Sequence, residues 1–226
     1  MFLIKKFVYT DFSGLLCHQE TKLIISFLIK EMISTLLKEI GKGTKSAALK
    51  KRVISFFMKN GFYTLPDLAK TLGLSIPTIT KLVEEFSSMG IVKERGKLET
   101  NGGRHPALYG LNPDSCYFAG VDVNKDSVSI GLIDFCGDMV EKQTGIAYDF
   151  ENTPAGLDRL CDIIRTFIST LSIDKDNIIK ISLNISGRVN PQSGYSYSRF
   201  NFEEQSLADV LTRKIGISAC IENDTR

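Results

Sequence analysis

The side chains best suited to chemistry lie in the middle third of the chain, just after a serine that can begin a helix. Ser75, Pro77, Thr78, Thr80 and Lys81 fall within seven residues. Small, polar and cationic side chains at the start of a helix can enter the major groove of DNA and reach base edges. We therefore predict that these five residues contact DNA, with Thr80 nearer the flank of the helix.

A second group of candidates lies in a glycine-rich loop between two short alternating segments, 91–95 and 107–111. This loop carries Lys97, Gly103, Arg104 and His105. Glycine adopts positive φ without steric cost, so such a loop can lie close to a phosphate backbone. The pattern predicts a β-hairpin wing that contacts the backbone or the minor groove of DNA.

Three helices must position these groups. The helical spacing of apolar residues, and the glycines that can end each helix, place the helices near 45–59, 65–72 and 76–89. Thr64 and Ser75 are the expected N-caps of the second and third helices. Two short helices joined by a turn that contains glycine form a helix-turn-helix. The alternative is a helical hairpin that serves packing alone. The third helix is expected to bury Ile76, Ile79, Leu82, Val83 and Phe86.

The net charge of +2 hides an uneven distribution along the chain. Residues 1–41 carry a net +1, residues 42–110 a net +7 and residues 111–226 a net −6. A basic segment suits a polyanionic partner, although a solvated surface gives the same composition. The order of helix, helix-turn-helix, strand, basic wing and strand favours double-stranded DNA as the partner of the middle third.

The acidic C-terminal half changes to period two, which is typical of strands. Strands are expected at 117–123, 128–134, 139–147, 178–185 and 217–221, with helices at 154–171 and 206–214. The order β-β-β-α-β-α-β predicts one lobe of an actin-like, ribonuclease-H-like ATPase fold, a topology that implies no activity by itself. The chain is thus expected to be α+β, with a helical extension at 1–41, a winged helix-turn-helix at 42–112 and the partial actin-like lobe at 113–226.

The five cysteines are widely spaced and form no C-x-x-C motif and no cluster with histidine. This spacing favours a reducing cytoplasm and predicts no structural metal. Residues 23–37 are apolar, but Lys30 and Glu31 interrupt them well before the ~20 residues that a membrane span needs. We expect an amphipathic helix suited to dimerisation, or a non-native extension ahead of Met32, with no signal peptide and no membrane partner.

Five segments jointly resemble the ROK (repressor, open reading frame, kinase) family, in the branch that carries an N-terminal winged helix and includes sugar-responsive repressors. They are Ser75–Val83, Asn101–Pro106, Gly120–Asp122, Ser186–Pro191 and Glu222–Asp224. The resemblance implies that Gly187, Arg188, Asn223 and Asp224 bind a sugar. Turn formation and strand capping are the alternative roles of these four residues.

Sugar-phosphorylating members of that family carry Asp-x-Gly-Gly-Thr after the first strand, whereas Asp122 here precedes Val-Asn-Lys-Asp. Side chains at those positions would crowd a nucleotide, and Asp126 would bring a carboxylate close to its phosphates. We therefore expect no enzymatic activity, no catalytic residue and no cofactor. A ROK-type sugar kinase with an added DNA-binding domain is one alternative, and a module that binds another protein is a second.

The chain stops two residues after Asp224, whereas the family continues through a second lobe. The sequence is therefore expected to hold only part of an effector domain, as a fragment or a truncated gene would. The leading hypothesis is a sequence-specific transcriptional regulator, a repressor of carbohydrate-related genes. It would act as a homodimer on double-stranded DNA, with a sugar or sugar phosphate as its effector.

Overall fold

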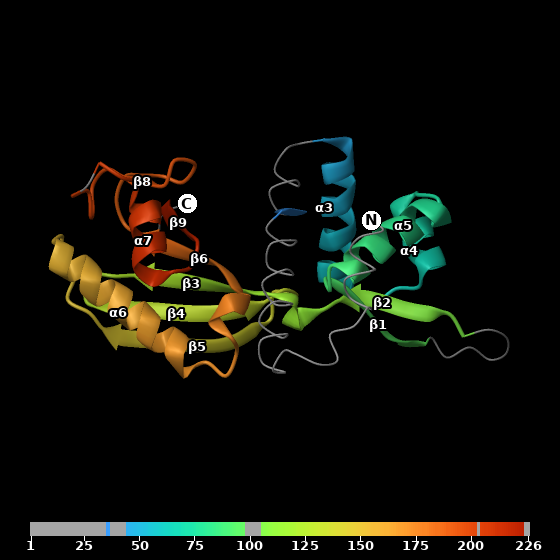
Figure 1. Ribbon diagram of the computed structural model, residues 1–226, viewed down its shortest axis with the longest axis horizontal. Coiled ribbons are helices and arrows are strands. Elements are labelled where there is room, and N and C mark those ends of the chain that lie inside the picture. Colours follow the sequence, from blue (N-terminus) through green and yellow to red (C-terminus); the bar gives the residue numbers. More distant parts are fainter. Residues whose placement is uncertain (1–34, 37–43, 98–104, 203, 224–226) are drawn as a thin grey trace, which may run out of the picture.

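The computed structural model describes residues 35–36, 44–97, 105–202 and 204–223. Figure 1 shows two parts side by side along the long axis, a group of helices with a two-stranded hairpin and a larger sheet flanked by helices. The first part comprises α3 (Lys45–Asn60), α4 (Leu65–Leu72), α5 (Ile76–Ser88), β1 (Val92–Lys97) and β2 (Ala107–Leu111).

The three helices form where the sequence places them, because each has a side-chain N-cap and a buried stripe. The hydroxyl of Thr44 caps α3 by accepting a hydrogen bond of 3.1 Å from the Ala47 N–H. Val53 and Phe57 on α3 are buried, and Gly61 ends the helix with a positive φ of 77°. The predicted helices are confirmed to within a residue or two.

β1 begins one residue later than predicted because the backbone of Ile91 is still hydrogen-bonded to the end of α5. The Ile91 N–H donates to the Phe86 carbonyl over 2.9 Å, which satisfies an orphan acceptor at the end of α5. Val92 is therefore the first residue to pair across the hairpin, with Leu111. β2 coincides with the predicted strand.

The core of the winged-helix part continues into the sheet part. Cys116, Phe135 and Ile179 of the sheet part belong to the same buried cluster as Phe57 of α3 and Phe86 of α5. Cys116 is 1% exposed, and burial raises the pKa of its thiol to about 12. The two parts therefore share apolar packing where they meet.

A five-stranded mixed sheet forms the second part, in the order β5-β4-β3-β6-β9. The first three strands pair antiparallel, whereas β6 joins β3, and β9 joins β6, in parallel. Its elements are β3 (Tyr117–Val123), β4 (Ser127–Asp134), β5 (Met139–Ala147), α6 (Pro154–Thr170), β6 (Ile178–Ile185), α7 (Leu207–Ile215) and β9 (Ala219–Asn223), with short 3-10 turns at Pro113–Ser115 and Lys175–Asn177.

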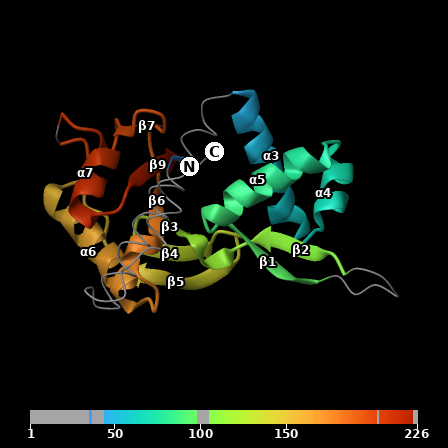
Figure 2. The same ribbon diagram turned by 45° about the vertical axis from the view of Figure 1, so that its right-hand side comes forward.

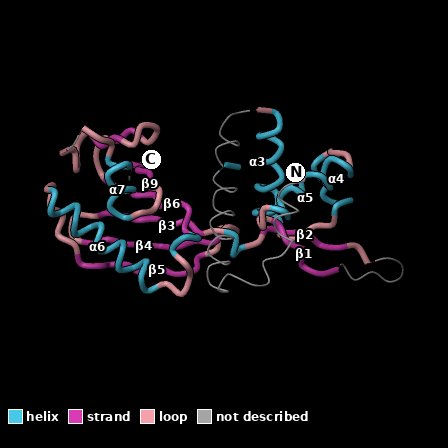
Figure 3. The backbone as a smooth tube through the Cα atoms, viewed as in Figure 1, coloured by secondary structure: helices cyan, strands magenta, loops and turns pink. Residues whose placement is uncertain are grey.

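Both helices of the sheet part pack on one face of the sheet, as Figures 2 and 3 show. Val121, Ile130 and Leu183 point to that face and join the buried cluster with Leu160 of α6 and Leu211 of α7. The alternate residues line the opposite face, and they are small or polar: Gly120, Asp122, Ser129, Gly131, Ser182 and Asn184. The predicted crossover topology of one actin-like lobe is confirmed.

Two details of the sheet part differ from the prediction. β9 runs from Ala219 to Asn223 instead of 217–221, because its ladder with β6 begins where Ala219 pairs with Ile181. A hairpin of β7 (Val189–Asn190) and β8 (Tyr195–Ser196) was not predicted, since two-residue strands leave no period to read. Within the described residues, no helix is long and apolar enough to cross a membrane.

Candidate nucleic-acid interface

The turn between α4 and α5 sets the angle of the second helix. Gly73 ends α4 in the left-handed region, at φ 63° and ψ 37°. The next residue, Leu74, donates its N–H to the Ala69 carbonyl over 2.9 Å. This bond satisfies one of the last carbonyls of α4, and Ser75 then starts α5 directly. The result is the tight turn that a helix-turn-helix requires.

The N-terminus of α5 is open to solvent and carries hydroxyl groups. The Ser75 Oγ accepts a hydrogen bond of 3.3 Å from the Thr78 N–H and lies 2.7 Å from the Thr78 Oγ1. Ser75 and Pro77 are exposed, and Thr78 is half-buried. The positive end of the helix dipole makes such a terminus suited to a phosphate.

The two remaining candidates on α5 differ in their freedom to contact DNA. The Thr80 hydroxyl donates to the Ile76 carbonyl over 2.9 Å, so it is already engaged within the helix. Lys81 is exposed one turn beyond Thr78. The structure brings Ser75, Pro77, Thr78 and Lys81 together on the outer side of α5, and their contact with DNA stays a prediction.

Ile76 was expected in the buried stripe of α5, and that expectation was wrong. Its side chain is 50% exposed, whereas Ile79, one turn later, is fully buried. The first turn of α5 projects beyond the packed core, so hydrophobic period alone misplaced this residue. An exposed isoleucine beside Ser75 and Thr78 offers apolar contact to the methyl group of thymine, which the major groove displays. The position at the first turn was the one signal in the sequence that pointed to exposure.

The hairpin of β1 and β2 lies beside the helices and extends away from them (Figure 1). Lys97 is exposed and pairs with Ala107 at the end of the ladder, and His105 is also exposed. The register shifts between Glu94 and Lys97, as in a β-bulge. Gly103 and Arg104 lie outside the described residues. A basic hairpin thus adjoins the helix-turn-helix, as the predicted wing requires.

A second candidate site lies at the end of the sheet, where the chain leaves β6 and β9. The Asn223 side-chain amide donates to the Gly187 carbonyl, and the Arg188 N–H donates to the Ser198 Oγ over 3.0 Å. Gly187 has φ 113°, a region that side chains rarely adopt. The structure therefore brings together Gly187, Arg188 and Asn223. Asp224 lies outside the described residues, and sugar binding by all four stays a prediction.

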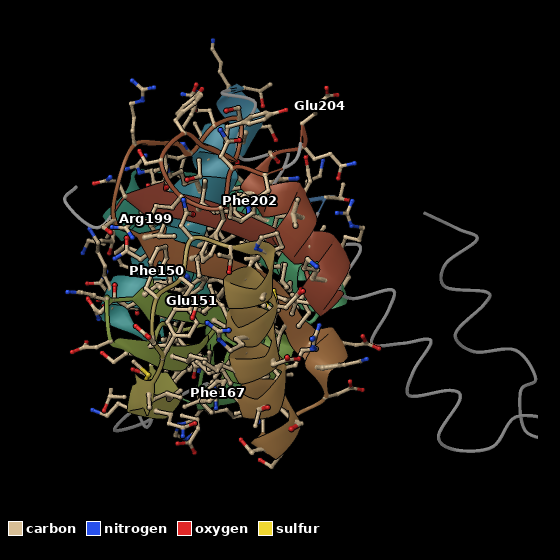
Figure 4. The ribbon with its side chains drawn as sticks, turned by 90° about the vertical axis from the view of Figure 1, so that its left-hand side faces the viewer. Phe150, Glu151, Phe167, Arg199, Phe202 and Glu204 are labelled. Atoms are coloured by element: carbon tan, nitrogen blue, oxygen red, sulfur yellow. The ribbon has the colours of Figure 1, made fainter. Side chains whose placement is uncertain are left out.

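The hairpin loop beside this site adds residues that the sequence pattern missed. The Arg188 guanidinium lies 5.1 Å from the centre of the Tyr197 ring, which is 49% exposed. Arg199 lies over Phe150 at 4.3 Å, and Figure 4 shows these two side chains next to each other. Cation–π contacts of this kind hold the loop in place. The unpredicted β7–β8 hairpin explains why no spacing in the sequence pointed to Tyr197.

The turn after β3, where kinases of the related family hold phosphates, is occupied by amide groups. Asn184 donates to one oxygen of Asp122 over 2.9 Å, and Asn124 donates to the other over 3.1 Å. The Asn124 N–H closes the turn onto the Ser127 carbonyl. Within the described part of the chain, no group of three or more His, Cys, Asp or Glu side chains is arranged to hold a metal ion.

The fold and the exposed helix terminus together define a class: a winged helix-turn-helix joined to one lobe of a sugar-kinase-like fold. Residues 47–93 match a family model described as a winged helix-turn-helix DNA-binding domain. The chain is 24% identical over 192 residues to a xylose repressor of Caldicellulosiruptor bescii, which covers 84% of this chain and 46% of that protein. It is also 24% identical over 176 residues to the xylose repressor of Bacillus subtilis, covering 77% and 45%. The chain therefore spans about half the length of the curated relatives that it matches.

A solved structure shares the fold of both parts. It is a ROK family transcriptional regulator, described as a homologue of the E. coli MLC protein, and it matches with a TM-score of 0.60 at 20% identity. The match covers 84% of this chain and 47% of that one. The predicted resemblance to ROK-type regulators is thereby confirmed for the winged helix and for the fold of the sheet part.

Proposed function

We propose that the protein is a DNA-binding transcriptional repressor of carbohydrate-related genes. In this proposal residues 42–112 read double-stranded DNA and residues 113–226 form part of an effector domain. The observation that carries the proposal is the exposed N-terminus of α5, where Ser75 and Thr78 present hydroxyls and Lys81 presents a cation. The similarity to xylose repressors supports the link to carbohydrate genes.

Charge supports duplex DNA over a protein as the partner of the winged helix. Residues 42–110 carry a net +7, whereas residues 111–226 carry a net −6. Binding to phosphates releases counterions, so affinity for DNA falls steeply with salt. A single recognition helix reads few base pairs, which is why we propose a homodimer on a two-fold symmetric site.

DNA binding can be tested by selecting a preferred duplex from a random library and measuring its affinity between 50 and 200 mM salt. Lys81→Ala should weaken binding and reduce the salt slope by about 1. Lys175→Ala is the matched control, because Lys175 is an exposed lysine in the acidic sheet part. An affinity independent of salt, or equal effects of the two variants, would contradict the proposal.

We further propose that the sheet part senses a ligand without performing phosphoryl transfer. Amides donate to both oxygens of Asp122, and Asn124 and Lys125 stand where the family pattern has its two glycines; both observations support this view. A coupled assay for ADP release with ATP and D-xylose or N-acetylglucosamine checks it, with no turnover expected above a protein-free blank. Turnover that disappears in Asp122→Asn would instead support the kinase alternative.

The proposed effector site comprises Gly187, Arg188, Asn223 and Asp224. The contact between Asn223 and Gly187 supports it, because this contact brings two strand ends together into one polar surface. D-xylose is the first probe, since the relatives are named xylose repressors. Titration of D-xylose and of sugar phosphates into the protein on its DNA should change the affinity for DNA, and Asn223→Ala should abolish the response. Loss of the response in the Lys175→Ala control as well would contradict this site.

A further inference from the structure

A lysine lies buried in the winged-helix part, on the first of its three helices. Lys50 on α3 is 6% exposed, although lysine is among the residues least often buried unless it is paired. Its ammonium lies 2.7 Å from the Glu85 carboxylate of α5. Removing a charge from water is costly, and only close pairing with an opposite charge offsets that cost. The pair therefore ties the first helix of the winged helix to the helix proposed to read DNA.

Glu85 lies on the same side of α5 as two residues of the candidate interface. Thr78, Lys81 and Glu85 are spaced by three and four residues, so their side chains are neighbours along one face of the helix. A lysine and a glutamate four residues apart attract each other. Among the described residues, no carboxylate lies within ion-pair distance of Lys81. Glu85 is held by Lys50 instead.

The direction in which the Glu85 carboxylate is held has a consequence for DNA binding. A carboxylate beside Lys81 would compete with DNA phosphates for its ammonium and would repel those phosphates directly. Only 32% of the Glu85 side chain is exposed, and 8% of that of Lys50. The negative charge of Glu85 is thus paired with the buried Lys50, on the α3 side of the helix.

We propose that Lys50 is a positioning residue for DNA binding: it holds the Glu85 carboxylate against α3, and so leaves Lys81 available to a DNA phosphate. This inference rests on the proposed function. Lys50 touches no DNA and acts through Glu85. Substitution of Lys50 therefore affects DNA binding through the unpaired carboxylate of Glu85, as well as through packing.

Four variants of the full chain separate these two effects: Lys50→Met, Glu85→Gln, the double variant, and Lys51→Met as a control for an exposed lysine on α3. Affinity for the selected duplex is measured at several salt concentrations, with thermal unfolding in parallel. Lys50→Met should lower affinity about tenfold at low salt, because it frees a carboxylate beside Lys81. Glu85→Gln and Lys51→Met should bind within about threefold of the wild type.

The double variant decides the proposal, because it lacks the ion pair but also lacks the free carboxylate. Its affinity should return to within about threefold of the wild type, even if its melting temperature does not recover. If Lys50→Met fails to fold, the proposal can still be tested with the double variant. Two neutral side chains of similar volume often replace a buried ion pair without loss of stability. A folded double variant that still binds tenfold more weakly overturns the inference, as does wild-type affinity in Lys50→Met. If the wild-type protein itself binds no DNA, the proposed function fails together with it.

Discussion

The ring of Phe62 lies directly over the backbone of Gly110, at the base of the wing. A Cβ atom added at Gly110 would stand 2.2 Å from the Cδ1 of Phe62. The ring also faces Arg95, whose guanidinium lies 5.2 Å from the ring centre and donates to the Leu111 carbonyl over 3.3 Å. The absence of a side chain at Gly110 thus makes room for a stack that joins the α3–α4 loop to both strands of the wing.

Gly110→Ala should therefore displace the Phe62 ring and lose its contact with Arg95. We expect a loss of about 1 kcal/mol in the free energy of unfolding, since the ring is 49% exposed and can move away. Urea denaturation measures the change. In a Phe62→Ala background the same substitution should cost much less. Equal costs in the two backgrounds would show that the ring is not the obstacle.

Ser75 is expected to serve both as a helix cap and as part of the DNA interface, and one substitution separates these roles. Ser75→Asp keeps an N-cap oxygen for the Thr78 N–H, so the melting temperature should stay within about 3 °C of the wild type. The added negative charge faces the DNA phosphates, and affinity should fall about tenfold. Ser75→Asn, an uncharged cap, is the control and should bind more tightly than Ser75→Asp. If the two variants bind alike, Ser75 lies away from DNA.

Ile76 should contribute to base preference through contact with a thymine methyl group. Ile76→Ala should leave stability nearly unchanged, because the side chain is half exposed, but should weaken binding by roughly 1 kcal/mol. Replacing individual thymines of the selected duplex by uracil removes the methyl groups one at a time. One such replacement should weaken the wild type and have no further effect on Ile76→Ala. A wild type indifferent to every replacement would exclude the contact.

Stability should fall at alkaline pH partly through Cys161 on α6. Burial raises the pKa of this thiol from 9.0 to about 11. The folded protein then holds the proton more tightly than the unfolded chain, so the stabilisation is full below pH ~9 and disappears as the pH rises towards 11. Cys161→Ala should show a shallower loss of unfolding free energy over this interval, measured by denaturation at each pH. Parallel profiles for the two proteins would refute this cause.

Local patterns were sufficient to predict most of the fold. The strands at 117–123, 139–147 and 178–185 have the predicted bounds in the structure, and the first and third of them alternate clearly in burial. Thr64 and Ser75 cap α4 and α5 as their positions indicated. The failures occur where local pattern carries little information, in the two-residue strands β7 and β8 and at Ile76.

The candidate sites likewise combine features that local sequence predicts with contacts that only the packed structure creates. The sequence by itself determined the exposed hydroxyls and the cation at the start of α5, because a helix cap and a period of 3.6 residues are local properties. Only the tertiary structure decided that Lys50 meets Glu85, 35 residues away, and that Asn223 meets Gly187, 36 residues away. Such pairs depend on how helices and strands pack, and side-chain packing leaves no period along the chain.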